Sequence, residues 1–83
     1  MSALRLALPG PEPEAFIGVR LGHAWFHVGY AGTRPTVVRR VTADGVPQGW
    51  WRIETLAPET PYALAARAAE AFLARQRLPA VAA

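Results

Sequence analysis

The two histidines are the residues whose type and spacing could support metal chemistry. His23 and His27 are four residues apart, the spacing of two zinc ligands on one helix face in His-Glu-x-x-His sites. Here Ala24 stands at the glutamate position, and the neighbouring residues alternate as they do in a strand. On a strand the two side chains would lie about 13 Å apart, whereas each zinc–nitrogen bond measures only about 2 Å. We therefore predict no metal site.

Nucleophilic and acid–base chemistry have equally few candidates. Cysteine is absent, the only serine is Ser2, and the only aspartate, Asp44, precedes a glycine and is typical of a turn. Glu12 and Glu14 flank a proline, in a segment where nothing fixes the distance between the two carboxylates. No glycine-rich loop precedes the C-terminal helix predicted below, so no phosphate or nucleotide cradle is expected. The sequence predicts a protein that is not an enzyme and binds no cofactor.

The elements that would position any site are read from the hydrophobic pattern, which alternates with the period of a strand. Leucines alternate over residues 3–8, and the proline-rich stretch 9–14 predicts an extended connector that cannot join a ladder. Residues 15–30 predict a hairpin with Gly22-His23 as a two-residue turn, and residues 32–35 predict a loop. Two further strands are predicted, over residues 36–42 and 50–56.

A C-terminal helix is predicted over 60–78, with a regular part from Pro61 to Arg77 and a frayed tail over 79–83. Thr60 suits the N-cap, Pro61 the first helical position, and Pro79 stops the helix. The helical wheel predicts one broad apolar stripe, which we expect to cover one face of the sheet. Its members are Tyr62, Leu64, Ala65, Ala68, Ala69, Phe72 and Leu73.

These elements predict one α+β domain over residues 1–83. A strand and connector (1–14) lead into an antiparallel sheet of four or five strands (15–56), and one amphipathic helix packs across it. Whether the first strand joins this sheet or that of another copy stays open. A chain of 83 residues with no disulfide buries only about 60% of its unfolded surface. It must therefore rely on its core or gain buried surface from a partner.

One helix leaves the second face of the sheet uncovered, and the aromatic residues make that face unusual. Trp50 and Trp51 are adjacent, so in a strand their indoles leave on opposite sides, and Trp25 opposes Phe26 in the same way. With Phe26 and Trp51 under the helix, aromatic and arginine side chains gather on the uncovered face. The candidate contact residues are Arg20, Trp25, His27, Arg40, Trp50 and Arg52.

The register of the strand over 36–42 stays open at this point. Val37 and Val41 compete with Val38 for the inward face, and Arg39 and Arg40 must point to opposite sides.

Three interpretations compete for the uncovered face. The tryptophans can be covered by loops, by the N-terminal segment and by arginine stems. The face can instead dock onto a larger protein or a second copy, because Trp, Tyr and Arg are enriched at interfaces. It can also bind single-stranded nucleic acid, with bases stacked on Trp25 or Trp50 and phosphates held by Arg20, Arg40 and Arg52. We predict a non-enzymatic accessory or adaptor protein first, acting by docking or homo-oligomerisation, and single-stranded DNA or RNA binding second.

The charge of the chain favours acidic partners only weakly. Nine basic residues against six acidic ones give +3 and a pI near 10.6. All nine are arginine, alanine is abundant, and lysine and asparagine are absent. This composition is typical of GC-rich coding sequences, so the sequence alone does not say whether the arginine content is functional.

One short segment resembles a known family. Pro47-Gln48-Gly49-Trp50, with Leu64 after thirteen further residues, resembles the Pro-x-Gly-Trp…Leu part of MbtH-like proteins. Those are small sheet-plus-helix chaperones of adenylation domains in peptide synthetases. The family's Ser-x-Trp-Pro segment is absent, because Arg40-Val41 stand where Trp-Pro should be, and its C-terminal Trp-Thr-Asp-x-Arg-Pro segment is missing too. The resemblance thus implies only that such a fold can serve as a docking module.

No apolar run in the sequence is long enough for a signal peptide or a membrane helix, because Arg5 interrupts the stretch over residues 3–8. We therefore expect a cytoplasmic protein that makes no use of a membrane.

Overall fold

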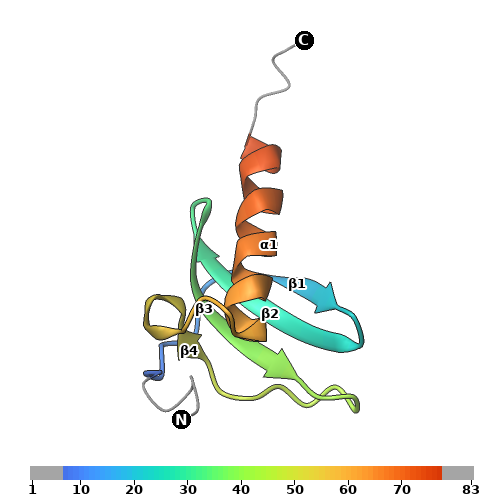
Figure 1. Cartoon of the computed structure of the whole chain (residues 1–83). Coiled ribbons are helices and arrows are strands. Elements are labelled where there is room, and N and C mark those ends of the chain that lie inside the picture. Colours follow the sequence, from blue (N-terminus) through green and yellow to red (C-terminus); the bar gives the residue numbers. More distant parts are fainter. Residues whose placement is uncertain (1–6, 78–83) are drawn as a thin grey trace.

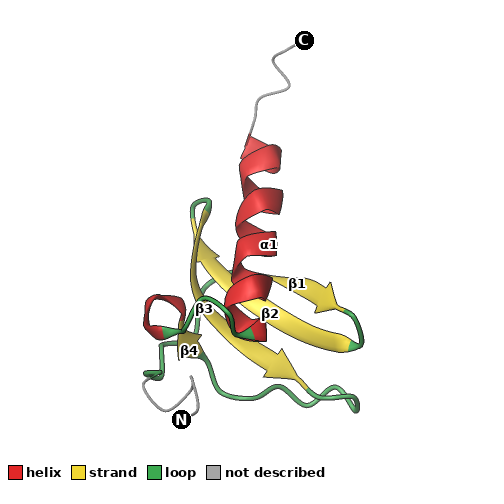
Figure 2. Ribbon diagram, in the orientation of Figure 1, coloured by secondary structure: helices red, strands yellow, loops and turns green. Residues whose placement is uncertain are grey.

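The computed structural model describes residues 7–77, which form a four-stranded antiparallel meander and one helix (Figures 1 and 2). The strands lie in the order β1-β2-β3-β4, and α1 packs against one face of the sheet. This arrangement confirms the predicted α+β fold. The elements are β1 (Phe16–Leu21), β2 (Ala24–Ala31), β3 (Arg34–Val41), β4 (Trp51–Arg52), a 3-10 helix (Ile53–Thr55) and α1 (Pro61–Arg77).

Two tight glycine turns connect the first three strands. Gly22 has a φ of 63°, and the pair Leu21–Ala24 closes the first hairpin around it, as the sequence predicts. Gly32, with a φ of 66°, turns the chain from β2 into β3. The predicted loop over 32–35 is too long, because Arg34 and Pro35 already pair with β2.

The last predicted strand, over 50–56, is wrong in its second half. Only Trp51 and Arg52 pair with β3, and the chain then turns into a 3-10 helix. The Thr55 hydroxyl donates to the Arg52 carbonyl at 2.7 Å, and the Leu56 amide donates to the Ile53 carbonyl at 3.0 Å. These local bonds replace ladder bonds and direct the chain towards the start of α1.

The proline-rich connector forms a single bridge to the sheet, whereas its prolines predict a segment that cannot join a ladder. The Gly10 amide donates to the Trp50 carbonyl at 3.0 Å, and the Arg52 amide donates to the Leu8 carbonyl at 2.8 Å. Pro9 lies opposite Trp51 between these bonds, where no proline N–H is needed. Most of the predicted strand over 3–8 and the predicted tail over 79–83 lie outside the described residues.

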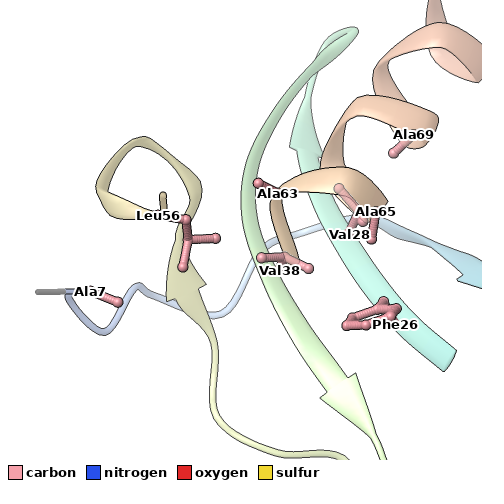
Figure 3. Close-up of a cluster of buried hydrophobic side chains, with 8 residues drawn as sticks. All are labelled: Ala7, Phe26, Val28, Val38, Leu56, Ala63, Ala65 and Ala69. Carbon is pink, nitrogen blue, oxygen red and sulfur yellow. The ribbon is translucent and has the colours of Figure 1, made fainter. Parts of the chain in front are cut away.

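The core lies between α1 and the sheet. Figure 3 shows the buried side chains of β2 and β3 facing the first turns of the helix. Phe26 is completely buried and meets the Tyr62 ring edge-on, with 5.5 Å between centroids. The helix contributes mainly alanines, whose small side chains let its axis lie close to the strands. The cluster consists of Ala7, Phe26, Val28, Val38, Leu56, Ala63, Ala65 and Ala69.

The helix begins as predicted but is rotated about its axis. The Thr60 hydroxyl accepts a bond of 3.2 Å from the Ala63 amide, which is an N-cap. Ala63 and Ala66 are buried, whereas Leu64 and Phe72 of the predicted buried stripe remain 44% and 41% exposed. Alanines lie on every side of this helix, so hydropathy alone does not fix its rotation.

The connector crosses the sheet on the side away from α1. In Figure 1 the blue segment passes behind the strands while the helix lies in front of them. A Cβ placed on Gly29 would lie 2.5 Å from Pro13 Cγ and 2.7 Å from Val37 Cγ2. Gly29 therefore leaves the space in which Pro13 rests on the sheet.

We predict that Gly29→Ala destabilises the fold by about 1–3 kcal/mol through overpacking. Gly49→Ala is the matched control, because a Cβ at Gly49 meets nothing within 4 Å and Gly49 has no positive φ. Urea unfolding of both variants measures the difference. Equal stability of the two variants would show that the connector does not pack on β2.

Candidate docking face on the uncovered side of the sheet

The face of the sheet away from α1, here called the outer face, is set by the strand register. Residues directly opposite one another in antiparallel strands share a face. Gly18, His27 and Arg39 form one row across three strands, and Arg20, Trp25 and Val41 form the next. Phe26 and Val38 are buried beneath α1, so their chain neighbours point outward. The outer side chains are Phe16, Arg20, Trp25, His27, Val37, Arg39, Val41, Trp50 and Arg52.

Arg39 stands at the centre of an aromatic cluster on this face, which we call the Arg39 cluster (Phe16, His27, Arg39 and Trp50). Its guanidinium carbon lies 4.3 Å from the Trp50 ring centroid and 5.4 Å from that of Phe16. Its Nε donates to His27 Nδ1 at 3.0 Å, and the His27 and Phe16 centroids are 4.4 Å apart. Cation–π contacts of this kind each contribute about 0.5–2 kcal/mol. The cluster therefore fixes three rings around one charge.

This environment lowers the pKa of His27 below its ordinary value of 6.5. Partial burial is the larger cause, because it disfavours the charged imidazolium, and the positive charge of Arg39 adds to it. The bond from Arg39 Nε requires an unprotonated Nδ1, which agrees with a neutral ring. His27 is thus a neutral acceptor that orients Arg39.

Trp25 and Arg20 form a second, more open unit beside the Arg39 cluster. The Trp25 side chain is 49% exposed, and the Arg20 guanidinium carbon lies 5.9 Å from its ring centroid. A Cβ on Gly18 would lie 3.7 Å from Trp25 Cζ3, so the indole rests beside bare backbone. Trp25 is therefore the large ring of this face that is most available to a partner.

The six predicted contact residues do not all lie together. Arg20 and Trp25 are adjacent, and His27 and Trp50 meet through Arg39. Arg52 lies apart, because its Nε donates to the Pro9 carbonyl at 3.1 Å.

Arg40 lies on the opposite face of the sheet. It pairs with Phe26, and its guanidinium carbon is 5.6 Å from the Phe26 ring centroid on the inner side. Because Val38 is the inward residue of β3, Arg40 points inward too and does not share a surface with Arg20 and Arg52.

Sequence reasoning missed Arg39 and Phe16 as members of this face. Phe16 precedes Ile17, which packs against the core, so the alternation of the strand already indicates that Phe16 points to the outer face. Arg39 could not be assigned while the register of β3 was open. The register is fixed by the pairing of Val28 with Val38, both fully buried, and sequence periodicity does not show that pairing.

The strands contribute three arginines, Arg20, Arg39 and Arg52, to the outer face, and none of the strands contains an aspartate or glutamate. Residues 15–43 contain four arginines and no aspartate or glutamate. Asp44, the first carboxylate after β3, belongs to a turn in which the Thr42 hydroxyl donates to it. That bond is the main reason why the pKa of Asp44 is lowered. The strands therefore present arginine without a carboxylate of their own beside it.

A cleft of about 660 Å³ lies between β3, the 3-10 helix and α1, and its lining includes Val37 and Arg52 at the border of the outer face. Its lining includes Arg34, Glu54, Arg67 and Glu70, so both signs of charge surround an apolar floor. Arg67 Nη2 donates to the Pro58 carbonyl at 3.4 Å. Among residues 7–77 no group of three or more His, Asp or Glu side chains is arranged to hold a metal ion. No helix in that range is both long and apolar enough to cross a membrane.

Comparisons with known proteins yield no relative. No family model matches the chain, and no curated protein or solved structure is similar to it. The short resemblance to MbtH-like proteins is therefore not supported by a family match.

We predict that the stability of the fold decreases as the pH falls below about 6.5, through the titration of His27. The folded pKa is the lower one, so between the two values the unfolded chain binds more protons and acid favours unfolding. The contribution is fully present above the unfolded pKa and is lost as the pH falls through the folded pKa. Thermal unfolding across this range measures the effect, and His27→Gln, which cannot titrate, is the control. An identical pH profile in the two proteins would contradict this role.

Proposed function

We propose that this protein is a non-enzymatic accessory protein that docks, through its outer face, onto an acidic segment of another protein. Trp25 is the central anchor and Arg20 its charged neighbour. The Arg39 cluster forms the rigid flank of the contact. Docking of this kind requires no chemical reaction by the chain.

The observation that carries this proposal is the half-exposed indole of Trp25 beside the Arg20 guanidinium. An exposed tryptophan on a sheet forfeits the burial that would stabilise it, while Trp and Arg are the residues most enriched at binding hot spots. Both residues lie on paired strands, so no backbone segment at this site has to become ordered when a partner binds. An aromatic and basic patch on ordered backbone is what an interface anchor requires.

The charge of the face indicates the chemistry of the partner. Arg20 and Arg39 stand on strands that carry no carboxylate. Complementary charge speeds association and excludes wrong partners. A segment that combines Asp or Glu with an apolar side chain would satisfy both the arginines and the exposed indole. Face-to-face pairing of two copies would instead bring like charges together.

Single-stranded nucleic acid is also anionic, but the geometry of the rings favours a protein. Stacking platforms need several open ring faces in succession, one for each base. Here the Trp50 ring lies beside Arg39, and Phe16 lies against His27. Trp25 is left as the one open tryptophan on the described outer face. Phe16 is 45% exposed, but its ring lies against His27, so Trp25 is the one large ring of this face without an aromatic neighbour and suits a protein anchor better than a run of bases.

Binding of a synthetic peptide with alternating acidic and apolar residues tests this function through tryptophan fluorescence. We predict that Trp25→Ala weakens binding at least tenfold, as loss of a hot-spot anchor does. Arg20→Gln should weaken it several-fold and reduce its salt dependence. Arg75→Gln is the matched control, because it removes the same charge from an exposed site on α1.

The same titration with single-stranded oligonucleotides distinguishes the two classes of partner. The proposal predicts tighter binding of the acidic peptide than of an oligonucleotide at equal charge and salt. If oligonucleotides bind and the peptide does not, or if Trp25→Ala binds the peptide as the natural chain does, protein docking through this face is wrong.

A further inference from the structure

The outer edge of β1 presents unpaired backbone groups. β1 is the terminal strand of the sheet and pairs with β2 along its whole length. The Tyr30 amide donates to the Ala15 carbonyl, so the odd-numbered residues of β1 direct their N–H and C=O groups towards β2. Phe16, Gly18 and Arg20 therefore direct an N–H and a C=O each away from the sheet. Such an edge is a template for another strand.

The two edges of the sheet differ in whether another segment of the chain covers them. The β4 edge is covered by Leu8–Gly10, which bond to its backbone on both sides of Pro9. The β1 edge has no such cover within residues 7–77, and its sequence contains no proline or lysine. The register shift of the sheet lies at Gly29/Tyr30, not in β1. Of the features that usually protect an exposed edge, β1 therefore has only one charged side chain, that of Arg20.

A flank of α1 is unpartnered as well, and it lies on the β1 side. The flank of α1 that faces β3 is the one that lines the cleft, and it carries Ala66, Arg67 and Glu70. At about 100° per residue, Phe72 lies roughly opposite Glu70, on the flank away from the cleft. Its side chain is 41% exposed. Figure 1 shows β1 emerging on the side of the helix away from β3.

We infer that the partner of this edge is a second copy of the chain, joined by antiparallel pairing of β1 with β1 about a two-fold axis at Gly18. Directly opposed residues must share a face, so odd-numbered residues pair with odd and even with even. An axis at Gly18 places Ile17 opposite Val19 of the second copy and Phe16 opposite Arg20. This register bonds the outward N–H and C=O of Phe16, Gly18 and Arg20 in both copies.

The side chains suit this register on both faces. Ile17 and Val19 form apolar, β-branched cross-strand pairs under the helices, where each is partly buried already. On the outer face Phe16, which is 45% exposed, lies opposite Arg20 of the second copy, where a cation–π contact can form. Gly18 pairs with itself and brings no side chain to the axis. A register centred on Val19 would instead place Phe16 opposite Gly22 in the turn and leave its aromatic ring unmatched.

The surrounding surface also favours a second copy over an unrelated strand. Pairing the two β1 edges brings both helices to the same side of one continuous sheet, with the flank that carries Phe72 turned towards the second copy. An isologous contact of this kind is self-complementary, which is the commonest arrangement in homodimers. The outer faces of the two copies then form one larger surface with Trp25 present twice.

Amide hydrogen exchange at high and low protein concentration tests the inference. At high concentration we expect a species of twice 9.0 kDa by sedimentation. In it the amides of Phe16, Gly18 and Arg20 should exchange slowly. On dilution these three should exchange quickly, whereas Ile17 and Val19, bonded to β2, stay protected. A monomer at millimolar concentration, or a dimer whose even-numbered β1 amides exchange quickly, would overturn the inference.

A matched pair of variants gives a second test. Gly18→Pro removes the outward N–H and places a ring on the edge, but breaks no bond to β2, so we expect a folded monomer. Gly18→Ala keeps that N–H and adds a Cβ only 3.7 Å from Trp25 Cζ3, an ordinary contact, so we expect a dimer. A dimer of Gly18→Pro would contradict the inference. The exchange pattern of the natural chain decides the question if Gly18→Pro does not fold.

Discussion

Alternation of side chains along β2 is the constraint on which the rest of the structure depends. Phe26 is completely buried beneath α1, so the neighbouring Trp25 must leave on the other side, where residues 7–77 provide no second α-helix. The same holds for Trp51 and Trp50 beside the last strand. One helix covers one face of the sheet, so large rings at adjacent strand positions cannot all be buried beneath it. The remaining aromatic side chains therefore lie on the outer face.

The aromatic side chains of the outer face fall into a covered group and an exposed group. Near one edge the connector crosses the sheet, with Pro13 over Gly29, and the Arg39 cluster holds three rings around a guanidinium. These contacts are structural and match the expectation that arginine and the N-terminal segment would cover part of the face. Near the hairpin of β1 and β2, Trp25 and Arg20 keep their exposure. The division between covered and open halves explains why one indole, and not all three, is proposed as the anchor.

Much of the fold was predictable because its signals are local. The turn at Gly22 needs a residue with positive φ, and the N-cap at Thr60 needs a hydroxyl ahead of Pro61. The opposite placement of Trp25 and Phe26 follows from strand geometry alone. These features need no knowledge of what lies across the sheet.

The remaining features depend on contacts distant in sequence. The position of Arg40 follows from Val38 facing Val28, and three valines in one strand offer no preference by themselves. The rotation of α1 buries Ala63 and Ala66 in place of Leu64 and Phe72, because small residues allow the helix to approach the strands closely. The end of β4 at Arg52 is set by the need to turn towards the start of α1. Sequence patterns do not carry such information.

The most direct test of the central claim is to follow the three indole N–H resonances while an acidic, partly apolar peptide is added at low salt. If the outer face is the docking surface, the Trp25 resonance shifts most and Trp51, which packs against the core, stays in place. Raising the salt should reverse the shift as the arginine contacts weaken. Shifts confined to Trp51, or no shift of Trp25 while the peptide binds, would contradict the account.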